Sequence, residues 1–406
     1  MTGRIVITGI GMVTPLGQDP GEVLRRVEAG ESAAAPPTGF DASPFACPVC
    51  AEVKDFQPQR YVVETKMVRL MNRDAQLAVA AAHLALQDAR LTVGADYQPQ
   101  DIALYGATGM AGLPLGEVTA LVRNSTGADG HFDPHRFGQQ GLKSISPLLS
   151  FKVLGNMPVC FVSICENIQG PNCIYTPWES QGAQAIEAGI RAIECGDARC
   201  ALVGGCDVKT HELAFIALEQ RGFFNSWKET QTGVVPGEGA VFLVLEEEAA
   251  ATARGARAYA RMAGFSISTR RQEADWSATY AAVLKRLQKS PPPSHPLTPT
   301  LSPTGGEGAR RAGEGDSDAR IELGAIVAAG EADDRSRRDE AAALASLAIT
   351  AETVLYPKQQ IGNLFAAAAA LQVGMGALLA QRLGQRVLAN CFGHGSEQGA
   401  FLLEKR

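Results

Sequence analysis

The stretch from residue 170 to residue 207 constrains the fold more than any other part of this chain. It reads GPNCIYTPWESQGAQAIEAGIRAIECGDARCALVGGCD. A turn at Gly170-Pro171 precedes a short apolar run, Cys173 to Thr176, which we expect to be a buried strand. Ser180 then begins a helical pattern, Gly196-Asp197 ends it, and the apolar run Cys200 to Gly204 predicts a second strand closed by a glycine pair. The pattern therefore predicts a strand, a sharp turn, a helix and a strand.

The inner face of the predicted helix carries apolar residues at helical spacing: Ala183, Ile186, Ile190 and Ile193. The sharp turn before it places Trp178 or Glu179 at a helix N-terminus, where backbone N–H groups are nearby. Several classes of enzyme place a nucleophile at such a position. We therefore treat this turn as the candidate reactive site.

Composition limits the function classes. The chain has 406 residues, 46% of them apolar, and a net charge of −6 without a long basic run, which argues against nucleic-acid binding. Arg4 to Gly9 reads as a strand and a turn rather than a secretory signal. The longest apolar run, Leu364 to Ala380, contains Gln372 and two glycines, so we expect a buried helix and no membrane span.

The nine cysteines are odd in number and irregularly spaced, which favours reduced thiols and a cytoplasmic protein. Cys47 and Cys50 have the spacing of a metal or redox pair. A zinc knuckle would need about four ligands, and neither a second pair nor adjacent histidines accompany them. We expect no metal and no cofactor. Gly9 and Gly11 suggest a dinucleotide loop, but Thr14 stands where the third glycine of that motif belongs.

Several motifs together resemble the β-ketoacyl synthase (condensing enzyme) family. They are IVITGIGMVTPLG at 5–17, Gly170-Pro171, Gly182, Ile186, Gly196-Asp197-Ala198, Gly204-Gly205-Cys206-Asp207 and GVVPGEGA at 233–240. The resemblance spans nearly the whole chain. It implies an α/β, thiolase-like fold in which two similar βαβ-rich halves, 1–250 and 251–406, form a five-layered α-β-α-β-α core.

The segment at about 290–318 differs from the rest in composition. Residues 291–318 read PPPSHPLTPTLSPTGGEGARRAGEGDSD, which holds too little apolar surface to form a packed core. We expect a disordered insert in a surface loop without a role. A docking segment in polyproline II form is the alternative.

The resemblance also implies where a condensing enzyme would carry its cysteine and two histidines. Here Glu179 stands at the cysteine position, Glu331 at the first histidine, and Asn363 at the second. Asp339 sets the register for Glu331. No catalytic residue of this set is intact, and a carboxylate cannot carry an acyl chain as a thioester.

Other residues of the family motifs are retained. Lys358 and Gly362 match the K-x-x-x-G-H motif, and Phe392 and Gly393 match the closing N-S-F-G-F-G-G turn. His394 takes the place of the second phenylalanine, which in the family gates the acyl pocket. By the same resemblance, 110–141 is expected to line the subunit interface and an acyl tunnel, and Ala201 to Gly204 to lie at a dimer interface.

The resemblance implies a catalytically degenerate homologue that acts as a chain-length factor. Such a subunit forms a heterodimer with an active ketosynthase and works with an acyl carrier protein in type II polyketide or fatty-acid-like biosynthesis, aryl polyene pathways among them. One alternative is an atypical β-ketoacyl synthase or acyltransferase that uses Glu179 as base or nucleophile. A loading decarboxylase is less favoured, because such enzymes keep the histidines. A third alternative is an acyl-binding module without a partner.

Overall fold

A computed structural model describes residues 4–62, 64–109, 115–269, 276–289, 321–331 and 334–406. The described residues form ten strands in one sheet with the order β3-β2-β4-β5-β1-β6-β10-β9-β7-β8. The strands are β1 (Ile5–Val13), β2 (Ile102–Thr108), β3 (Asn172–Tyr175), β4 (Cys200–Val208), β5 (Glu238–Glu247), β6 (Ala260–Thr269), β7 (Ile321–Val327), β8 (Ile349–Leu355), β9 (Val387–Cys391) and β10 (Glu397–Glu404). The expected insert at about 290–318 lies outside the described residues.

The strand order repeats itself. In β1 to β5 the order is third, second, fourth, fifth and first in the chain, and β6 to β10 follow the same order from the other end of the sheet. The fourth strand of each half pairs in parallel with the second and antiparallel with the fifth. The halves meet where β1 and β6 pair over two residues, Val6 and Ile7. The boundary expected at residue 250 falls between β5 and β6 and stays a prediction.

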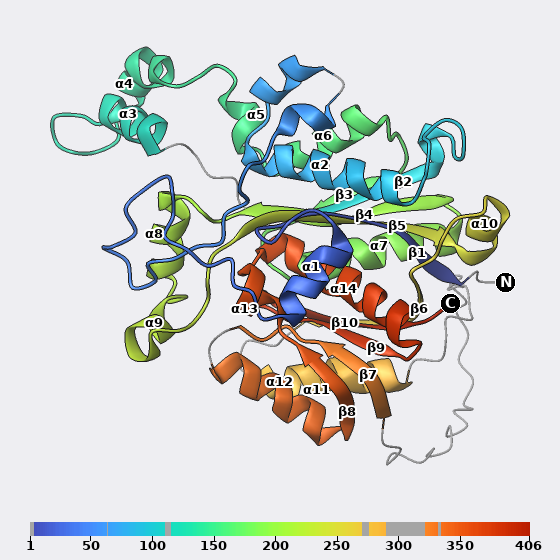
Figure 1. Ribbon diagram of the computed structural model, residues 1–406. Helices are drawn as coiled ribbons and strands as arrows, with labels where there is room; N and C mark the ends of the chain where they lie inside the picture. The colour runs from blue at the N-terminus through green and yellow to red at the C-terminus, as the bar shows by residue number, and fades with distance from the viewer. Residues whose placement is uncertain (1–3, 63, 110–114, 270–275, 290–320, 332–333) are drawn as a thin grey trace, which may run out of the picture.

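Helices lie on both faces of the two half-sheets, which gives five layers (Figure 1). α2 and α6 cover β1 to β5, α7 and α14 pack side by side between the half-sheets, and α11 and α12 cover β6 to β10. The helices are α1 (Pro20–Glu28), α2 (Arg73–Asp88), α3 (Leu115–Ser125), α4 (Pro134–Arg136), α5 (Leu149–Val153), α6 (Met157–Glu166), α7 (Gln181–Cys195), α8 (Glu212–Gln220), α9 (Asn225–Thr230), α10 (Glu248–Ala253), α11 (Trp276–Lys289), α12 (Asp334–Ser346), α13 (Pro357–Ile361) and α14 (Ala368–Leu383). The expected α-β-α-β-α core is confirmed.

The unit around residues 170–207 has the predicted order of elements, with two corrections. β3 is an edge strand with exposed or half-buried residues, because β2 alone among the described strands pairs with it; the expectation of a buried strand was wrong. β4 continues through Gly204 and Gly205 to Val208 and lies inside the sheet between β2 and β5. Ala201 to Gly204 are therefore already paired on both sides, and the expectation that they form a dimer interface was also wrong.

Gly205 in β4 allows the second half of the chain to approach the first. A β-carbon at Gly205 would lie 2.3 Å from the carbonyl oxygen of Ala366, a distance at which the backbone would have to move. Ala366 lies three residues after Asn363, so this glycine helps to place the loop that carries Asn363.

The apolar run at 364–380 forms α14 and the short turn before it. The helix Phe365–Leu383 is long and apolar enough to cross a membrane, but 78% of its most apolar window is buried inside the fold. It packs against α7 and against strands of both half-sheets. This is the position of a core helix, as the sequence predicted.

Candidate active site

Five side chains from four connections meet at one place. Glu179 lies between β3 and α7, and Glu331 follows β7. Lys358 lies in α13 and Asn363 just after it, in the connection between β8 and α14, while His394 lies between β9 and β10. The connections that carry Glu179 and Asn363 occupy corresponding places in the two halves. The candidate site lies outside the carboxyl ends of parallel strands, a common location for ligand sites in α/β proteins.

The carboxylate of Glu179 is held by three protein donors. Its Oε1 accepts hydrogen bonds from Nδ2 of Asn363 (2.8 Å) and, in the appropriate tautomer, from Nδ1 of His394 (2.9 Å). Its Oε2 accepts a hydrogen bond from the backbone N–H of His394 (3.1 Å). The N-terminal amides of α7 were expected to serve this position, but the stabilising amide comes from the β9–β10 connection. Glu179 is 1% exposed.

Asn363 joins the two glutamates. Its Nδ2 donates to Glu331 Oε1 as well as to Glu179, at 2.8 Å in both cases, and its Oδ1 accepts the backbone N–H of Phe365 at 2.7 Å. Phe365 has φ +43°, a left-handed conformation that is unfavourable for a bulky residue. The bond from Asn363 therefore helps to hold a strained turn directly behind the site.

Lys358 provides the buried positive charge. Its Nζ donates to Glu331 Oε1 (2.9 Å) and to the carbonyl oxygen of Phe392 (3.4 Å), and it lies 3.9 Å from Glu179 Oε1. Lys358 and Glu331 are each 3% exposed. Two buried carboxylates thus share one ammonium group, and the imidazole of His394 is the second group that can balance their charge.

Burial and charge shift the pKa of each ionisable group in this cluster. Burial raises the pKa of Glu179, but the charges and hydrogen bonds of His394, Lys358 and Asn363 outweigh it and hold that pKa well below its usual range. For Glu331, burial is the larger effect and raises the pKa, although Lys358 and His394 oppose it. Burial lowers the pKa of His394 and Lys358, but the nearby glutamates outweigh it and raise both. These shifts favour an anionic Glu179 beside a protonated His394.

Glu340 in α12 is a supporting residue that sequence reasoning missed. Its carboxylate accepts the backbone N–H groups of Ala329 (3.0 Å) and Gly330 (2.9 Å) and an N–H of Asn390 (2.6 Å). It therefore fixes the loop that carries Glu331. The expected register relied on its neighbour Asp339, whereas the buried carboxylate that holds this loop belongs to Glu340. Only the alanines that follow Glu340 hint at its burial, since Arg338 and Asp339 precede it directly.

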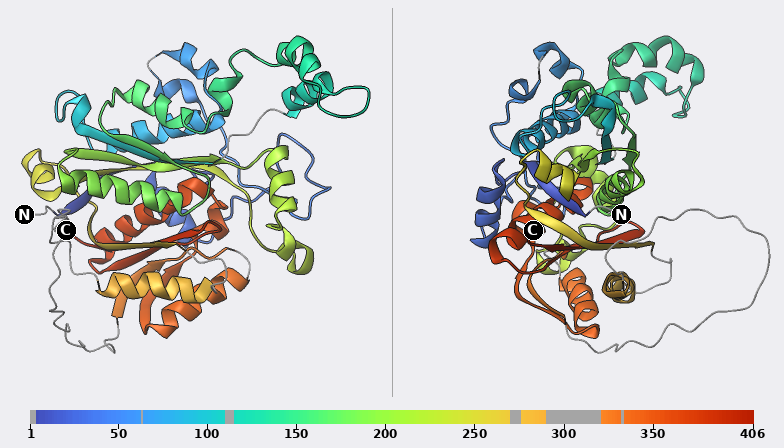
Figure 2. Two further views of the ribbon diagram at one scale, coloured as in Figure 1. Left: turned by 180° about the vertical axis from the view of Figure 1, so that it is seen from behind. Right: turned by 90° about the vertical axis from the view of Figure 1, so that its right-hand side faces the viewer.

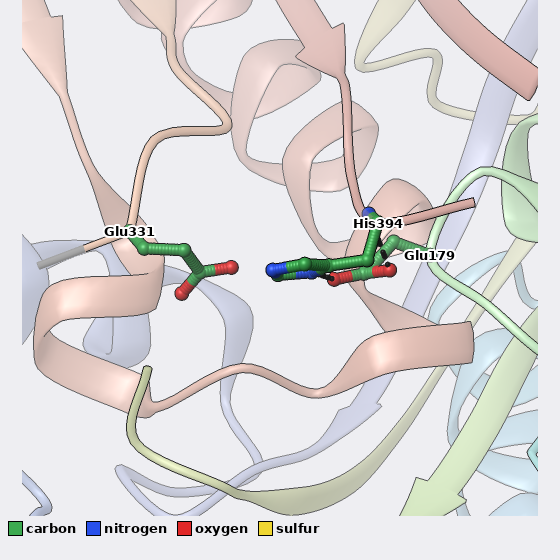
Figure 3. Close-up of side chains that lie close together, drawn as sticks. All are labelled: Glu179, Glu331 and His394. Atoms are coloured by element: carbon green, nitrogen blue, oxygen red, sulfur yellow. Dashed lines mark hydrogen bonds and ion pairs between the residues drawn. The ribbon is translucent and has the colours of Figure 1, made fainter. Parts of the chain in front are cut away.

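A cavity of about 520 Å³ opens onto the cluster. Glu331, Lys358 and His394 form part of its wall, aromatic rings form another part, and arginines lie around it. The aromatic residues are Phe223, Trp276, Tyr280 and Phe392, and the arginines are Arg221, Arg335 and Arg338. Figure 3 shows the carboxyl group of Glu331 pointing toward the imidazole of His394 and the carboxyl group of Glu179.

His394 was expected to replace a gating phenylalanine. Its ring packs on Phe223 with 4.3 Å between ring centroids, and 34% of its side chain is exposed. It lines the cavity, as a gate would, and it also hydrogen-bonds the residue at the predicted nucleophile position. The sequence did not indicate this bond. The role as a gate stays a prediction.

The retained glycines have clear conformational roles. Gly362 has φ +83°, and a β-carbon there would lie 2.7 Å from Cβ of Ala51. A β-carbon at Gly393 would lie 2.6 Å from Cβ of Glu179. Both positions bring backbone close to the residues of the cluster, so the retained motif glycines preserve the geometry of the site even though the reactive side chains differ.

Metal binding fits this cluster poorly. One ligand atom each from Glu179, Glu331 and His394 lie within 4.8 Å of one another. However, the ammonium group of Lys358 and the amide N–H groups of Asn363 already contact the glutamate oxygens that a cation would need. A metal ion would have to displace a fixed positive charge.

Cys47 and Cys50 do not form a metal site with other side chains in the part of the chain that the structure describes. Both are buried, and burial raises the pKa of each thiol to about 12. Such thiols are inert, because the reactive form is the thiolate. Cys173, which the sequence placed near the nucleophile turn, is exposed on the edge strand β3.

Relatives of known function extend these observations. A 3-oxoacyl-[acyl-carrier-protein] synthase 2 of Coxiella burnetii is 30% identical over 278 residues, which are 65% of this chain and 63% of the relative. The protein of the same name from a Synechocystis species is 28% identical over 276 residues, 65% of this chain and 62% of the relative. The matched part spans less than two thirds of either relative.

Solved structures show the same fold. "The ishigamide ketosynthase/chain length factor" has a TM-score of 0.76 at 20% identity, and a β-ketoacyl synthase from Burkholderia phymatum has 0.75 at 20% identity, each covering 100% of both chains. These likenesses confirm the thiolase-like fold. The family model described as the N-terminal domain of β-ketoacyl synthase matches residues 2–251, more than half of the chain. Together with the order of strands and the placement of the motifs, this match establishes that the chain belongs to the β-ketoacyl synthase family.

Proposed function

We propose that this chain is a catalytically degenerate β-ketoacyl synthase homologue that serves as the chain-length factor of an active ketosynthase. The observation that carries the proposal is the state of Glu179. The residue at the nucleophile position is a buried carboxylate whose oxygens are already bonded to Asn363 and His394. It cannot form the thioester on which condensation depends.

The same geometry argues against the alternative, an acyltransferase that uses Glu179. A nucleophile or base needs an available lone pair and a pKa near the working pH. His394, Lys358 and Asn363 hold the pKa of Glu179 well below its usual range, and three donors occupy its oxygens. These contacts stabilise the carboxylate and make it a poor acceptor of a substrate proton.

One face of the molecule supports assembly with a partner. β3 forms one edge of the sheet, where no further strand of the described residues pairs with it. Eight of the eleven exposed large apolar side chains among the described residues lie between residues 115 and 164, including Val122 (57%), Phe132 (65%) and Ile164 (61%). α3 and α4 in this segment project from the body of the molecule (Figures 1 and 2). Such a concentration is typical of a protein interface.

The proposed partner is an active ketosynthase, and the proposed complex is a heterodimer in the cytoplasm. The relatives are 3-oxoacyl-[acyl-carrier-protein] synthases, and one similar structure is of a ketosynthase in complex with its acyl-carrier protein. We infer that this chain works with an acyl carrier protein through its partner. The product is of the type II polyketide or fatty-acid-like class, aryl polyenes among the candidates.

The first test separates a degenerate subunit from an active one. The purified chain is incubated with acyl thioesters of an acyl carrier protein, and its intact mass is measured. We expect no covalent adduct, because Glu179 cannot hold a thioester. A stable acyl adduct on any cysteine of the chain contradicts the proposal.

The second test concerns the partner and the product. The chain is co-expressed with the ketosynthase encoded beside it, and the complex is analysed by size-exclusion chromatography. Residues 115–137 are proposed to reach toward the partner's acyl tunnel; residues 110–114, which are expected there as well, lie outside the described residues. Phe132→Ala is expected to lengthen the product and Leu121→Trp to shorten it. The chain-length role is contradicted if the chain forms a homodimer and does not bind the ketosynthase. It is also contradicted if the complex stays intact and product length is unchanged in both variants.

A further inference from the structure

The cavity wall holds two ionisable groups that the proposed function does not use. Glu331 Oε1 is bonded to Lys358 and Asn363, whereas its Oε2 has no hydrogen-bond partner among the described residues. His394 is bonded to Glu179 through Nδ1, which leaves Nε2 available to a ligand. A carboxylate oxygen of Glu331 and a ring nitrogen of His394 lie within 4.8 Å of each other, and both residues line the cavity.

We propose that Glu331 and His394 form a general base and a general acid that remove water from a β-hydroxyacyl thioester bound in this cavity. This reaction needs no covalent nucleophile, metal or redox cofactor, so it suits a site that has lost its cysteine. A hydrogen and a hydroxyl on neighbouring carbons can face both groups at once, since each needs a contact of about 2.6 to 3.2 Å. The choice of a thioester rests on the proposed function.

The elimination breaks one C–H bond and one C–O bond of the substrate and forms a carbon–carbon double bond. Glu331 Oε2 takes the proton from the α-carbon, and the electron pair of that C–H bond forms the double bond between the α- and β-carbons. The bond between the β-carbon and its hydroxyl breaks, and protonated His394 gives its Nε2 proton to the leaving oxygen. The products are an α,β-unsaturated thioester and water. Solvent in the cavity then returns the proton from Glu331 to His394.

The surroundings assign these roles in this order. Burial raises the pKa of Glu331, which strengthens it as a base, while the Glu179 carboxylate raises the pKa of His394 and keeps it protonated as an acid. Lys358 lines the same cavity, and its positive charge favours the negative charge that develops on the substrate as the α-proton leaves. Glu179 acts through His394 and is a positioning residue.

The cavity also fits the substrate class. Aromatic rings of Phe223, Trp276 and Tyr280 suit an unsaturated acyl chain, and Arg221 and Arg335 suit an anionic carrier arm. The substrate would come from a reduction of a 3-oxoacyl thioester to the 3-hydroxyacyl form. Its product, a conjugated acyl chain, would be the starting point for further extension by a condensing partner.

The experiment uses the full-length chain and two soluble probes, the N-acetylcysteamine thioesters of 3-hydroxybutyrate and 3-fluorobutyrate. Fluoride leaves with little help from an acid, so it bypasses His394 but still needs the base. We expect the wild type to form the unsaturated thioester from both probes. Glu331→Gln should lower both rates by about 100-fold or more, and His394→Gln should do so only for the hydroxy probe.

Matched controls are His135→Gln, exposed on α4, and Glu187→Gln, half-buried on α7, which should keep the wild-type rates. Thermal unfolding checks that each variant is folded. Glu179→Gln should move the alkaline limb of the pH–rate profile to lower pH, because His394 then faces only Glu331 and Lys358 among the charged groups of the cluster. An effect on folding alone would not move this limb.

Two results overturn the proposal: no elimination by the wild type above the buffer rate with either probe, or wild-type rates in folded Glu331→Gln and His394→Gln. Neither result depends on the ketosynthase. A chain that eliminates water but binds no ketosynthase contradicts only the chain-length role, and a chain that assembles and shapes product length without elimination contradicts only this inference.

Discussion

Two buried carboxylate clusters in this protein are built from similar parts and differ in their exposure to a ligand. Glu246 on β5 accepts hydrogen bonds from Nε and a terminal nitrogen of Arg254, both at 2.6 Å, from Tyr97 (2.7 Å), and from Thr8. In the second cluster, the carboxylates of Glu179 and Glu331 accept hydrogen bonds from Lys358, Asn363 and His394. Both carboxylate oxygens of Glu246 have hydrogen-bond partners. In the Glu179 cluster, by contrast, Glu331 and His394 line a cavity that a ligand could enter.

This difference separates a structural charge from a functional one. Burial raises the pKa of Glu246, but Arg254, Thr8 and Tyr97 outweigh it and lower the pKa, so the carboxylate stays charged and bound. The pKa of Glu331 is raised instead, and one of its oxygens has no partner among the described residues. A group that can change its protonation state beside a cavity is better suited to chemistry than to stability.

The largest expected effect on the free energy of unfolding comes from a change in the Glu246 cluster. Arg254→Met leaves Glu246 buried and uncompensated, so we expect the free energy of unfolding to fall by about 3 to 5 kcal/mol. Chemical denaturation with urea measures it. Arg386→Met, which removes an ion pair from a side chain that is 61% exposed, is the control and should have little effect. Equal losses in the two variants would remove the distinction between the clusters.

Lys358→Met should lower the free energy of unfolding by less than Arg254→Met does. Glu331 can take up a proton and the cavity admits water, so we expect a loss of about 1 to 3 kcal/mol rather than the full cost of a buried charge. Adding Glu331→Gln to this variant should restore part of the loss, and a double-mutant cycle measures that coupling. Lys405→Met, exposed near the C-terminus, is the control. A loss larger than that of Arg254→Met would show that the two clusters are equally structural.

The smallest effect is a difference in pH dependence. Because the folded-state pKa of Glu246 is lowered, its contribution to stability is present above the unfolded pKa of about 4.3 and is lost as the pH falls through the folded pKa. For Glu331 the folded pKa is raised, so its contribution is largest below about pH 4.3 and falls as the pH rises through the folded pKa.

Urea denaturation of the wild type, Glu246→Gln and Glu331→Gln between about pH 2 and 8 tests this difference, because the Glu246 effect develops below about pH 4.3 and the Glu331 effect above it. Relative to its variant, the wild type should gain stability with pH for Glu246 and lose it for Glu331, by at most about 1.4 kcal/mol per pH unit for one proton. Slopes of the same sign would contradict the contrast between the clusters.

Residues close in the sequence determined much of this protein. The apolar spacing at Ala183, Ile186 and Ile190 was sufficient to predict the helix, because helix faces depend on local residue types. The glycine motifs carried the resemblance to the family, and that resemblance implied the five layers. The loss of a cysteine at Glu179 was also visible in the sequence. The edge strand β3 was wrongly expected to be buried, because a central and an edge strand can have similar apolar runs.

Only the tertiary structure decided what replaced the lost chemistry. The bonds from His394 and Asn363 to Glu179 join residues 215 and 184 positions apart in the sequence. The hydrogen bonds by which Glu340 holds the loop before Glu331 depend on how α12 packs against α11 and β8. No local pattern encodes such contacts, because they arise when the two half-sheets bring the ends of their strands together. The sequence alone therefore identified a family scaffold without its nucleophile. The packing of its two halves created a buried charge cluster, of which Glu331, Lys358 and His394 line a cavity.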